Sequence, residues 1–270
     1  MDLKVAVAGA GGQMGAAIIR AVVATPGLSI HSAFDRPGKP AVGLDAGTAA
    51  GIGALDLTIG DDPETALAGA DALIDFTAPA ASVLLAQYAA RTGMVDIVGT
   101  TGCTEEDDEA IYAAAAAGAR IVKAGNFSLG VNLLRGLVKR AAAVLGDDFD
   151  IEILEMHHRR KVDAPSGTAL MLGQAAAAGR GLSLSEHSIR SRDGITGPRP
   201  RGDIGFAALR GGTVVGDHTV VFAGEAERIE MTHRADNRTI FANGAVRATL
   251  WAAEQPSGLY SMADVLGFTD

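Results

Sequence analysis

The stretch Lys4-Val-Ala-Val-Ala-Gly-Ala-Gly-Gly-Gln-Met-Gly15 decides the fold of the first half of this 270-residue chain. Its first residues form a short apolar run of strand length, which glycines end at once. An apolar, helix-forming stretch follows at 16–24 and is closed by Pro26-Gly27. A strand, a glycine turn and a helix in this order are typical of a dinucleotide-binding unit, where the helix N-terminus faces a pyrophosphate.

The glycine spacing departs from the strict G-x-G-x-x-G pattern, because Met14 stands where the third glycine would be. The frame that fits is Gly9, Gly12 and Gly15. Glycine at such positions permits the tight turn, lets the backbone approach a pyrophosphate, and lets helix and strand pack closely. The alternative is a purely structural glycine turn at a strand–helix junction.

The next predicted strand, residues 28–34, ends in Asp35 and Arg36. An acidic residue about 20 positions past the glycine turn is placed to bind an adenosine ribose. Asp35 can accept hydrogen bonds from the ribose hydroxyls of NAD, whereas Arg36 can pair with a 2′-phosphate and stack on adenine. The two residues predict a site that tolerates NAD and NADP without ranking them. The alternative is a polar turn over residues 35–38.

Strands and helices continue to alternate after an irregular excursion at 37–62 that is rich in Gly, Ala and Pro. Strands are predicted at 70–77, 94–98 and 119–122, and helices at 80–90 and from 104 onward. Such alternation predicts an α/β fold with a parallel, doubly wound sheet of the Rossmann type. The turns Gly99-Thr-Thr-Gly102 and Ala124-Gly-Asn-Phe127 fall at carboxyl ends of strands, where ligands bind, and they suit the nicotinamide ribose and carboxamide.

After a helix at 130–145, strands follow one another with little helix between them. They are predicted at 149–156, 186–192, 204–209, 213–216, 218–223 and 227–233, with one helix at 168–178. This pattern predicts an α+β domain with an antiparallel or mixed sheet. Apolar residues at helical spacing predict the core face of the first helix at Leu133, Leu134, Leu137, Val138, Ala141 and Leu145.

Two domains are therefore expected. Residues 1–127 form the dinucleotide-binding domain, and residues 128–237 form the substrate-binding domain. Helices predicted at 239–253 and 262–266 can return to the first domain, so residues 238–270 are assigned to it.

Composition and charge exclude several classes of protein. The chain is 48% hydrophobic and 20% charged, and no apolar run approaches the roughly 20 residues that span a bilayer. A net charge of -9 argues against nucleic-acid binding. The first residues enter a strand directly, so no signal peptide is expected, and the single Cys103 fits a reducing compartment. We therefore expect a cytoplasmic protein, and the Cys/His spacing predicts no metal site.

Against this acidic background, the run His157-His-Arg-Arg-Lys161 places five basic or potentially basic side chains in a row. Histidine is the usual proton donor near neutral pH, and a lysine becomes one when burial or neighbouring cations depress its pKa. Alternate residues of a strand share a face, so His157, Arg159 and Lys161 could point together. A solvated basic loop and a polybasic nucleic-acid patch are the alternatives.

The turn Ala164-Pro-Ser-Gly167 follows the basic run and opens a helix. The hydroxyl and main-chain N–H groups of Ser166-Gly-Thr168 can chelate a carboxylate at that helix start. A small, doubly charged carboxylate would therefore fit both the basic run and the turn.

The run Glu155-x-His157-His158-x-x-Lys161-x-Asp163-x-Pro165-Ser166-Gly167-Thr168-Ala169 resembles the signature of the 4-hydroxy-tetrahydrodipicolinate reductase family. These enzymes act in the diaminopimelate route to lysine. The resemblance covers nearly the whole chain, and it includes residues 5–15, 75–77, 99–102, 125–128 and 241–245.

The resemblance implies a role for each matching residue. His157 matches the family's proton donor and acceptor, and Lys161 matches its proton donor. Substrate contacts are implied for His158, Gly167 and Thr168. Cofactor contacts are implied for Gly9, Ala10, Gly11, Gly12, Gln13, Met14, Asp35, Arg36, Gly99, Thr100, Thr101, Ala124, Gly125, Asn126 and Phe127. Arg159 and Arg160 stay unassigned, and we expect them to face solvent.

The same resemblance implies NADH- or NADPH-dependent reduction of a small cyclic dicarboxylate by a homotetramer, assembled through a mixed-sheet second domain. Cys103, Ala78 and Lys123 depart from the family pattern, which leaves the cofactor preference and fine positioning open. An amino-acid dehydrogenase with a similar two-domain plan is one alternative. A dinucleotide sensor that has lost turnover is another.

Overall fold

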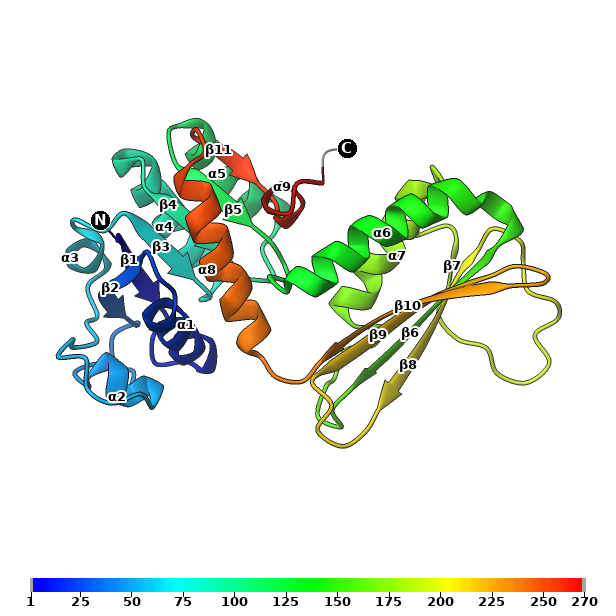
Figure 1. Cartoon of the computed structure of the whole chain (residues 1–270), viewed down its shortest axis with the longest axis horizontal. Helices are drawn as coiled ribbons and strands as arrows, with labels where there is room; N and C mark the ends of the chain where they lie inside the picture. The colour runs from blue at the N-terminus through cyan, green and yellow to red at the C-terminus, as the bar shows by residue number, and fades with distance from the viewer. Residues whose placement is uncertain (1, 269–270) are drawn as a thin grey trace. The chain divides into compact units, whose positions relative to one another are not determined.

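The computed structural model describes residues 2–268 and divides the chain into two compact units (Figure 1). Unit 1 comprises residues 1–129 and 238–270, and unit 2 comprises residues 130–237. The sequence pattern placed the first boundary after residue 127. Residues 1, 269 and 270, which the prediction assigned to the first domain, lie outside the described residues.

Unit 1 is built on a six-stranded sheet with the order β11-β5-β4-β3-β1-β2, in which all neighbouring strands are parallel. Its strands are β1 (Leu3–Ala8), β2 (Leu28–Phe34), β3 (Ala72–Asp75), β4 (Val95–Val98), β5 (Arg120–Lys123) and β11 (Gly258–Tyr260). The predicted Rossmann-type sheet is confirmed. Strand β11 was missed, because a three-residue strand is too short to show an alternating pattern.

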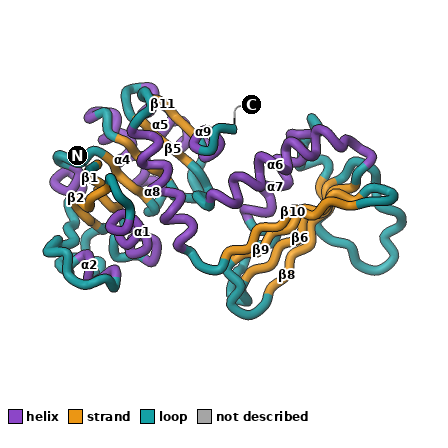
Figure 2. Tube along the Cα trace, viewed as in Figure 1, coloured by secondary structure: helices purple, strands orange, loops and turns teal. Residues whose placement is uncertain are grey.

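Helices cover both faces of this sheet (Figure 2). They are α1 (Gln13–Ala24), α2 (Ala46–Ala50), α3 (Pro63–Leu67), α4 (Pro79–Thr92), α5 (Glu105–Ala116), α8 (Thr239–Ala253) and α9 (Met262–Val265). Helices α1 and α8 pack on one face, and α4 and α5 pack on the other. The C-terminal helix α8 therefore lies beside α1 and covers β3, β4 and β5. The predicted irregular excursion at 37–62 holds one short helix, α2.

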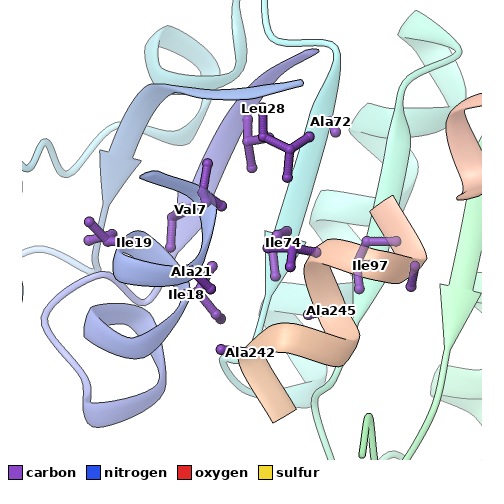
Figure 3. Close-up of a cluster of buried hydrophobic side chains, with 14 of the residues drawn as sticks. Val7, Ile18, Ile19, Ala21, Leu28, Ala72, Ile74, Ile97, Ala242 and Ala245 are labelled. Atoms are coloured by element: carbon purple, nitrogen blue, oxygen red, sulfur yellow. The ribbon is translucent and has the colours of Figure 1, made fainter. Parts of the chain in front are cut away.

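Figure 3 shows the cluster beneath α1 and α8. Ile74 and Ile97 project from the sheet toward Ile18 of α1 and toward Ala242 and Ala245 of α8, and all five side chains are fully buried. Burial of one large aliphatic side chain contributes roughly 1.5–3 kcal/mol, so this cluster fixes α1 against the sheet. The glycine turn that precedes α1 is thereby held in place.

Unit 2 is a five-stranded mixed sheet with the order β10-β9-β6-β8-β7, covered by helices on one face. Its elements are α6 (Leu129–Leu145), the 3₁₀ turn η1 (Gly146–Asp148), β6 (Asp150–His157), α7 (Gly167–Gly179), β7 (Ser188–Ile189), β8 (Ile204–Arg210), β9 (Gly216–Ala223) and β10 (Arg228–Ala235). Central strand β6 runs antiparallel to β9 and parallel to β8. The predicted mixed sheet is confirmed.

One predicted strand of unit 2 is wrong, and a second is much shorter than predicted. Residues 213–215 lie in the connection that precedes β9, which begins at Gly216. The strand predicted at 186–192 is limited to the two residues of β7. In both cases the apolar or alternating run is short and glycine or charged residues flank it, so local pattern cannot set the strand's ends.

Helix α6 buries only part of the predicted stripe, because Leu134 and Val138 are buried and Ala141 and Leu145 pack against the core, but the remaining two residues do not. Val131, Leu134 and Val138 are buried, whereas Leu133 and Leu137 are each 46% exposed. The helix is apolar on more than one side, so spacing alone could not identify the packed face. The position of α7 decides it.

Strand β6 determines which side chains of unit 2 lie beneath the helices. Ile151, Ile153, Glu155 and His157 alternate along the strand and are buried on the helix-covered face. Leu154, on the opposite face, is 41% exposed. His157 is therefore the last residue of a core-facing row. Among residues 2–268, no helix is both long and apolar enough to cross a membrane.

Candidate active site

The glycine turn of unit 1 presents the start of α1 without a side-chain cap. Gly9 has a positive φ of 68°, and Gly12 is the N-cap of α1 but offers no side-chain acceptor. A Cβ on Gly15 would lie 2.3 Å from the Gly9 carbonyl oxygen, so only glycine fits there. The first main-chain N–H groups of α1 are available to an anion, and this geometry suits a pyrophosphate.

Asp35 lies directly beside this turn. Its carboxylate accepts a hydrogen bond from the Gly11 N–H at 3.0 Å and another from the Arg36 N–H at 2.8 Å. A Cβ on Gly11 would lie 2.9 Å from the same carboxylate, so this glycine is needed as well as those of the predicted frame. A carboxylate has about four acceptor directions, and the remaining ones can bind ribose hydroxyls. The exposed Arg36 is free to meet a 2′-phosphate.

A buried polar cluster ties together the turns after β3 and β4. The Thr100 hydroxyl accepts a hydrogen bond from the Thr77 N–H at 2.9 Å and lies 2.8 Å from the Ser82 hydroxyl. Ser82 and Thr77 both donate to Asp75. Burial raises the pKa of Asp75, and these hydrogen bonds offset the rise only in part. The Thr100 hydroxyl is committed to the fold, so a cofactor contact there would come from its main chain.

Two further residues of the predicted cofactor set have side chains in the core. Ala10 and Phe127 are each 1% exposed, and the Phe127 ring packs on Phe76 at 5.5 Å between centroids. Only their main-chain atoms could face a ligand. Other predicted cofactor residues are exposed or half-buried at the carboxyl end of the sheet, namely Gly9, Gly11, Gly12, Gln13, Met14, Gly99, Thr101, Ala124, Gly125 and Asn126.

The departures from the family pattern have simple structural settings. Ala78 is the N-cap of α4 and provides no side-chain hydrogen bond. Lys123 pairs with Asp108 at 2.8 Å. Cys103 packs against the core under α4 and α5, and burial raises the pKa of its thiol. A raised pKa opposes thiolate formation, which agrees with a passive role.

In unit 2, Glu155 and His157 form the centre of a buried polar group. Nδ1–H of His157 donates to Glu155 Oε2 at 2.5 Å. Arg210, at the end of β8, donates to both carboxylate oxygens at 2.8 and 2.9 Å. Burial alone would raise the pKa of Glu155, but the hydrogen bonds from Arg210 and His157 outweigh it and the pKa is lowered. Glu155 is therefore an anion at neutral pH.

A second imidazole lies against the first. His218 of β9 is the cross-strand partner of Glu155, and its ring stands edge-on to that of His157 at 5.1 Å between centroids. Its Nε2 lies 3.1 Å from the Ser166 hydroxyl. Burial, followed by the charge of His157, lowers the pKa of His218 to about 4. His218 is neutral at physiological pH.

The basic run leaves the strand immediately after His157. Arg159 and Arg160 lie in a turn and are exposed, as expected, so the strand alternation that could have brought His157, Arg159 and Lys161 to one face ends at His157. The strand ends because the main chain turns there: the Lys161 N–H bonds to the His158 carbonyl at 3.0 Å. Lys161 Nζ instead pairs with Asp163 at 2.7 and 2.9 Å.

Ser166 caps the helix that follows. Its hydroxyl accepts from the Ala169 N–H at 3.1 Å, and its own N–H donates to Glu155 Oε1 at 3.1 Å. Gly167 and Thr168 are the first residues of α7, where main-chain N–H groups point along the helix axis toward any bound anion. The predicted substrate residues Gly167 and Thr168 therefore lie at a helix start that is tied to the Glu155 carboxylate, and His158 is half-buried at the beginning of the same segment.

Sequence reasoning gave no role to Glu155, Arg210 or His218. Glu155 carried a usable signal, because it alternates with His157 and so shares its face of the strand. Arg210 and His218 carried none, since only the pairing of β6 with β8 and β9 brings them to His157. No group of three or more residues that could hold a metal ion occurs among residues 2–268.

The parallel sheet, with the uncapped N-terminus of α1 and the Asp35 carboxylate at one edge, makes unit 1 a dinucleotide-binding unit. A chain that couples it to a buried imidazole and a helix start suited to carboxylates has the parts of a nicotinamide-dependent oxidoreductase.

Comparison with known families assigns the whole chain. Residues 3–127 match the family model "Dihydrodipicolinate reductase, N-terminus", and residues 130–266 match "Dihydrodipicolinate reductase, C-terminus". The chain belongs to the dihydrodipicolinate reductase family. It is an oxidoreductase of the diaminopimelate route to lysine and uses NADH or NADPH, as the sequence predicted.

Individual relatives agree with this family assignment. The chain is 57% identical to 4-hydroxy-tetrahydrodipicolinate reductase of Rhodopseudomonas palustris (strain BisB18), covering 100% of this chain and 99% of the relative. It is 56% identical to the enzyme of the same name from Rhizobium rhizogenes, covering 99% and 97% of the two chains.

The fold agrees as well. A solved structure of dipicolinate-bound dihydrodipicolinate reductase from Paenisporosarcina sp. TG-14 matches with a TM-score of 0.78 and 22% identity, over 98% of this chain and 99% of the other. An amine dehydrogenase from Mycobacterium smegmatis shares the fold more distantly, with a TM-score of 0.60 and 14% identity over 97% and 95% of the two chains.

Proposed function

We propose that the chain reduces 4-hydroxy-tetrahydrodipicolinate, by way of dihydrodipicolinate, to tetrahydrodipicolinate, with His157 and Lys161 moving the protons. The observation that carries the proposal is the Nδ1–H hydrogen bond from buried His157 to ionised Glu155. It holds the ring and its tautomer, so that Nε2 is the nitrogen that gives up and regains a proton.

Reduction of a conjugated C=C or C=N bond needs a hydride at one carbon and a proton elsewhere. The nicotinamide supplies the hydride when it is bound. His157 in its cationic form donates from Nε2 and keeps Nδ1–H on Glu155, so the group stays paired throughout. Lys161 supplies the second donor. Its pairing with the exposed Asp163 gives it a fixed position until a substrate carboxylate competes for the ammonium.

The start of α7 is proposed as the carboxylate anchor. Main-chain N–H groups of Gly167 and Thr168 lie at the positive end of a 13-residue helix, where an anion is stabilised. His158 provides a further substrate contact at the start of the same segment. The substrate is a small cyclic dicarboxylate, so one carboxylate can bind the helix start while the other faces the basic side chains.

The cofactor contacts are proposed along the carboxyl edge of the unit 1 sheet. The N-terminus of α1 holds the pyrophosphate, Asp35 holds the ribose, and Arg36 extends the site to a 2′-phosphate. Main-chain groups at 99–101 and 124–127 face the nicotinamide end. The buried side chains of Thr100 and Phe127 support this set by fixing the turns, not by touching the ligand.

A homotetramer assembled through unit 2 is also proposed. The sheet face away from α6 and α7 carries apolar side chains, with Leu154 at 41% and Leu209 at 47% exposure. A patch of this kind on a sheet is costly to leave in water and is typical of subunit interfaces. Light scattering should show a tetramer that Leu154→Glu converts to smaller species, and a monomeric wild-type chain would contradict the proposal. The lone Cys103 supports a cytoplasmic location.

The direct test is a coupled assay with the product of the preceding synthase step and either NADH or NADPH. We expect loss of the reduced-nicotinamide absorbance only when the synthase product is present. Omission of the synthase is the matched control for cofactor oxidation by itself. Absence of substrate-dependent oxidation with both cofactors would refute the proposed reaction.

A further inference from the structure

We infer that Glu155 and Arg210 form a positioning pair that makes His157, and not its neighbour His218, the imidazole that carries the positive charge. The inference rests on the proposed proton-transfer role of His157. Both act at one remove from the substrate: Glu155 acts through the His157 ring that it binds, and Arg210 acts through Glu155.

The Glu155 carboxylate is 1% exposed and has a complete set of partners. Oε1 accepts from Arg210 Nη2 at 2.9 Å and from the Ser166 N–H at 3.1 Å. Oε2 accepts from Arg210 Nη1 at 2.8 Å and from His157 Nδ1 at 2.5 Å. A buried carboxylate held from three sides has one orientation, so it fixes the ring plane of His157.

The choice between the two imidazoles follows from what each one touches. His157 meets an anion, whereas His218 Nε2 lies against the Ser166 hydroxyl and its buried Nδ1 has no hydrogen-bond partner within residues 2–268. The rings lie 5.1 Å apart, so two adjacent imidazolium ions would repel each other strongly in this dry setting. One positive charge is stable, and Glu155 places it on His157.

The same pair also anchors the returning end of the segment that carries Lys161. The segment leaves β6 after His157 and returns at Ser166, whose N–H is bound to Glu155. Near its end, the Asp163 carbonyl accepts from Arg210 Nη2 at 2.6 Å. A single buried ion pair thus sets the position of the proposed acid, of the lysine segment and of the start of α7.

The pH profile of kcat distinguishes this positioning role from a merely structural one. Activity that depends on an imidazolium falls as pH rises, which gives an alkaline limb. The charged and titratable groups around His157 are Glu155 on its own strand, Arg210 on β8, His218 on β9, and Lys161 with Asp163 on the following segment.

Glu155→Gln removes the negative charge but keeps the shape, so the limb should move to lower pH by about one unit or more, and kcat should fall by about 10–10²-fold. Arg210→Gln removes a positive charge from the same carboxylate, so the limb should move to higher pH. General damage to the fold would not produce shifts of opposite sign. The affinity of each variant for NADPH, bound by unit 1, should equal that of the wild type and reports that the protein is folded.

Glu152→Gln is the matched control. Glu152 lies on the same strand with its own bidentate arginine partner, Arg192, at 2.8 and 2.9 Å, but on the face away from His157. The alkaline limb of the kcat profile of Glu152→Gln should coincide with that of the wild type. Should either Glu155→Gln or Arg210→Gln fail to fold, the other still gives a signed shift.

The outcomes separate this inference from the proposed function. If His157→Gln keeps wild-type kcat and limb, the proton-transfer role itself is wrong. If His157→Gln abolishes the limb while Glu155→Gln and Arg210→Gln both leave it in place, only the positioning role is overturned. An alkaline limb that disappears in His218→Asn but persists in His157→Gln would place the positive charge on His218 and overturn the inference.

Discussion

Two fully buried carboxyl groups in this protein have pKa values that are shifted in opposite directions. Glu155, in the central strand of unit 2, is 1% exposed and bound by Arg210, His157 and Ser166. Asp96, in β4 of unit 1, is 0% exposed, and neither of its oxygens has a hydrogen-bond partner in the part of the chain that the structure describes. The pKa of Glu155 is lowered, whereas burial and then the charge of Asp75 raise the pKa of Asp96 well above 3.8.

The difference shows that burial does not decide the charge of a carboxyl group; its partners do. Glu155 stays ionised because β8 brings the Arg210 guanidinium to it and His157, on its own strand, donates a hydrogen bond to it. The pKa of Asp96 is raised because the group is buried, and strands β3 and β5 face it with the apolar Leu73 and Ile121. The first group can support proton transfer, and the second can only cost stability.

The largest expected effect is on kcat, and it should occur at the site around Glu155 but not at Asp96. His157→Gln and Lys161→Ala should each lower kcat by roughly 10²–10⁴-fold, the range for loss of a general acid. Asp96→Asn, the control from the other buried carboxyl site, should leave kcat unchanged. Steady-state kinetics in the coupled assay measures all three. Near-normal turnover in both His157→Gln and Lys161→Ala would remove their assigned roles.

The next effect is on stability, and it tests the partnered carboxylate. Arg210→Gln leaves the buried Glu155 anion without its charged partner, so the free energy of unfolding should fall by about 3–5 kcal/mol at neutral pH. Denaturant titration measures it. Because the folded-state pKa of Glu155 is lowered below the usual 4.5, the contribution of this carboxylate is present above that pH and is lost as pH falls through the folded value. Arg210→Gln should therefore differ less from the wild type in acid, and an equal deficit at every pH would contradict this account.

The unpartnered carboxyl group should respond in the opposite direction. Asp96→Val removes a buried polar group with no partner and suits a strand, so unfolding should cost about 1–3 kcal/mol more. The native state retains the Asp96 proton above the unfolded value of 3.8, so the wild-type free energy of unfolding should decline as pH rises from there, until the raised folded pKa is passed.

That decline should be smaller in the Asp96→Val variant when unfolding is followed across the pH range. Asp75→Val is the control on the same sheet. It removes the acceptor of the Ser82 and Thr77 hydroxyls, so it should lower the free energy of unfolding. A destabilised Asp96→Val protein would show that Asp96 has a partner after all.

The smallest expected effect is on the KM for the cofactor, at the partly buried Asp35 and its neighbour Arg36. Asp35 is half-buried, and its main-chain donors leave acceptor directions open. The exposed Arg36 beside it should discriminate a 2′-phosphate, so Arg36→Ala should raise KM for NADPH by about tenfold and KM for NADH much less. Lys39→Ala, on the same exposed loop, is the control. Equal losses with both cofactors would reject the 2′-phosphate role.

Much of the site could be read from local pattern. The run Gly9–Gly15, the acid at Asp35 and the signature from His157 to Thr168 each concentrate several functional residues in one short segment. The prediction failed where three-dimensional packing decides, as at Leu133 and Leu137 of α6, which were expected in the core and are exposed. It also failed to separate Thr100 and Phe127, whose side chains serve the core, from neighbours that face outward.

The sequence by itself determined the alternation of strands and helices, the dinucleotide turn and the identity of the family, because these depend on residues close together in the chain. Only the tertiary structure decided which side chains surround His157. Glu155 is two residues away, but Arg210 and His218 reach His157 only through the pairing of β6 with β8 and β9, and burial there lowers the pKa of His218. Electrostatic interactions act through space and depend on desolvation, and strand pairing is what brings distant charges into one dry site.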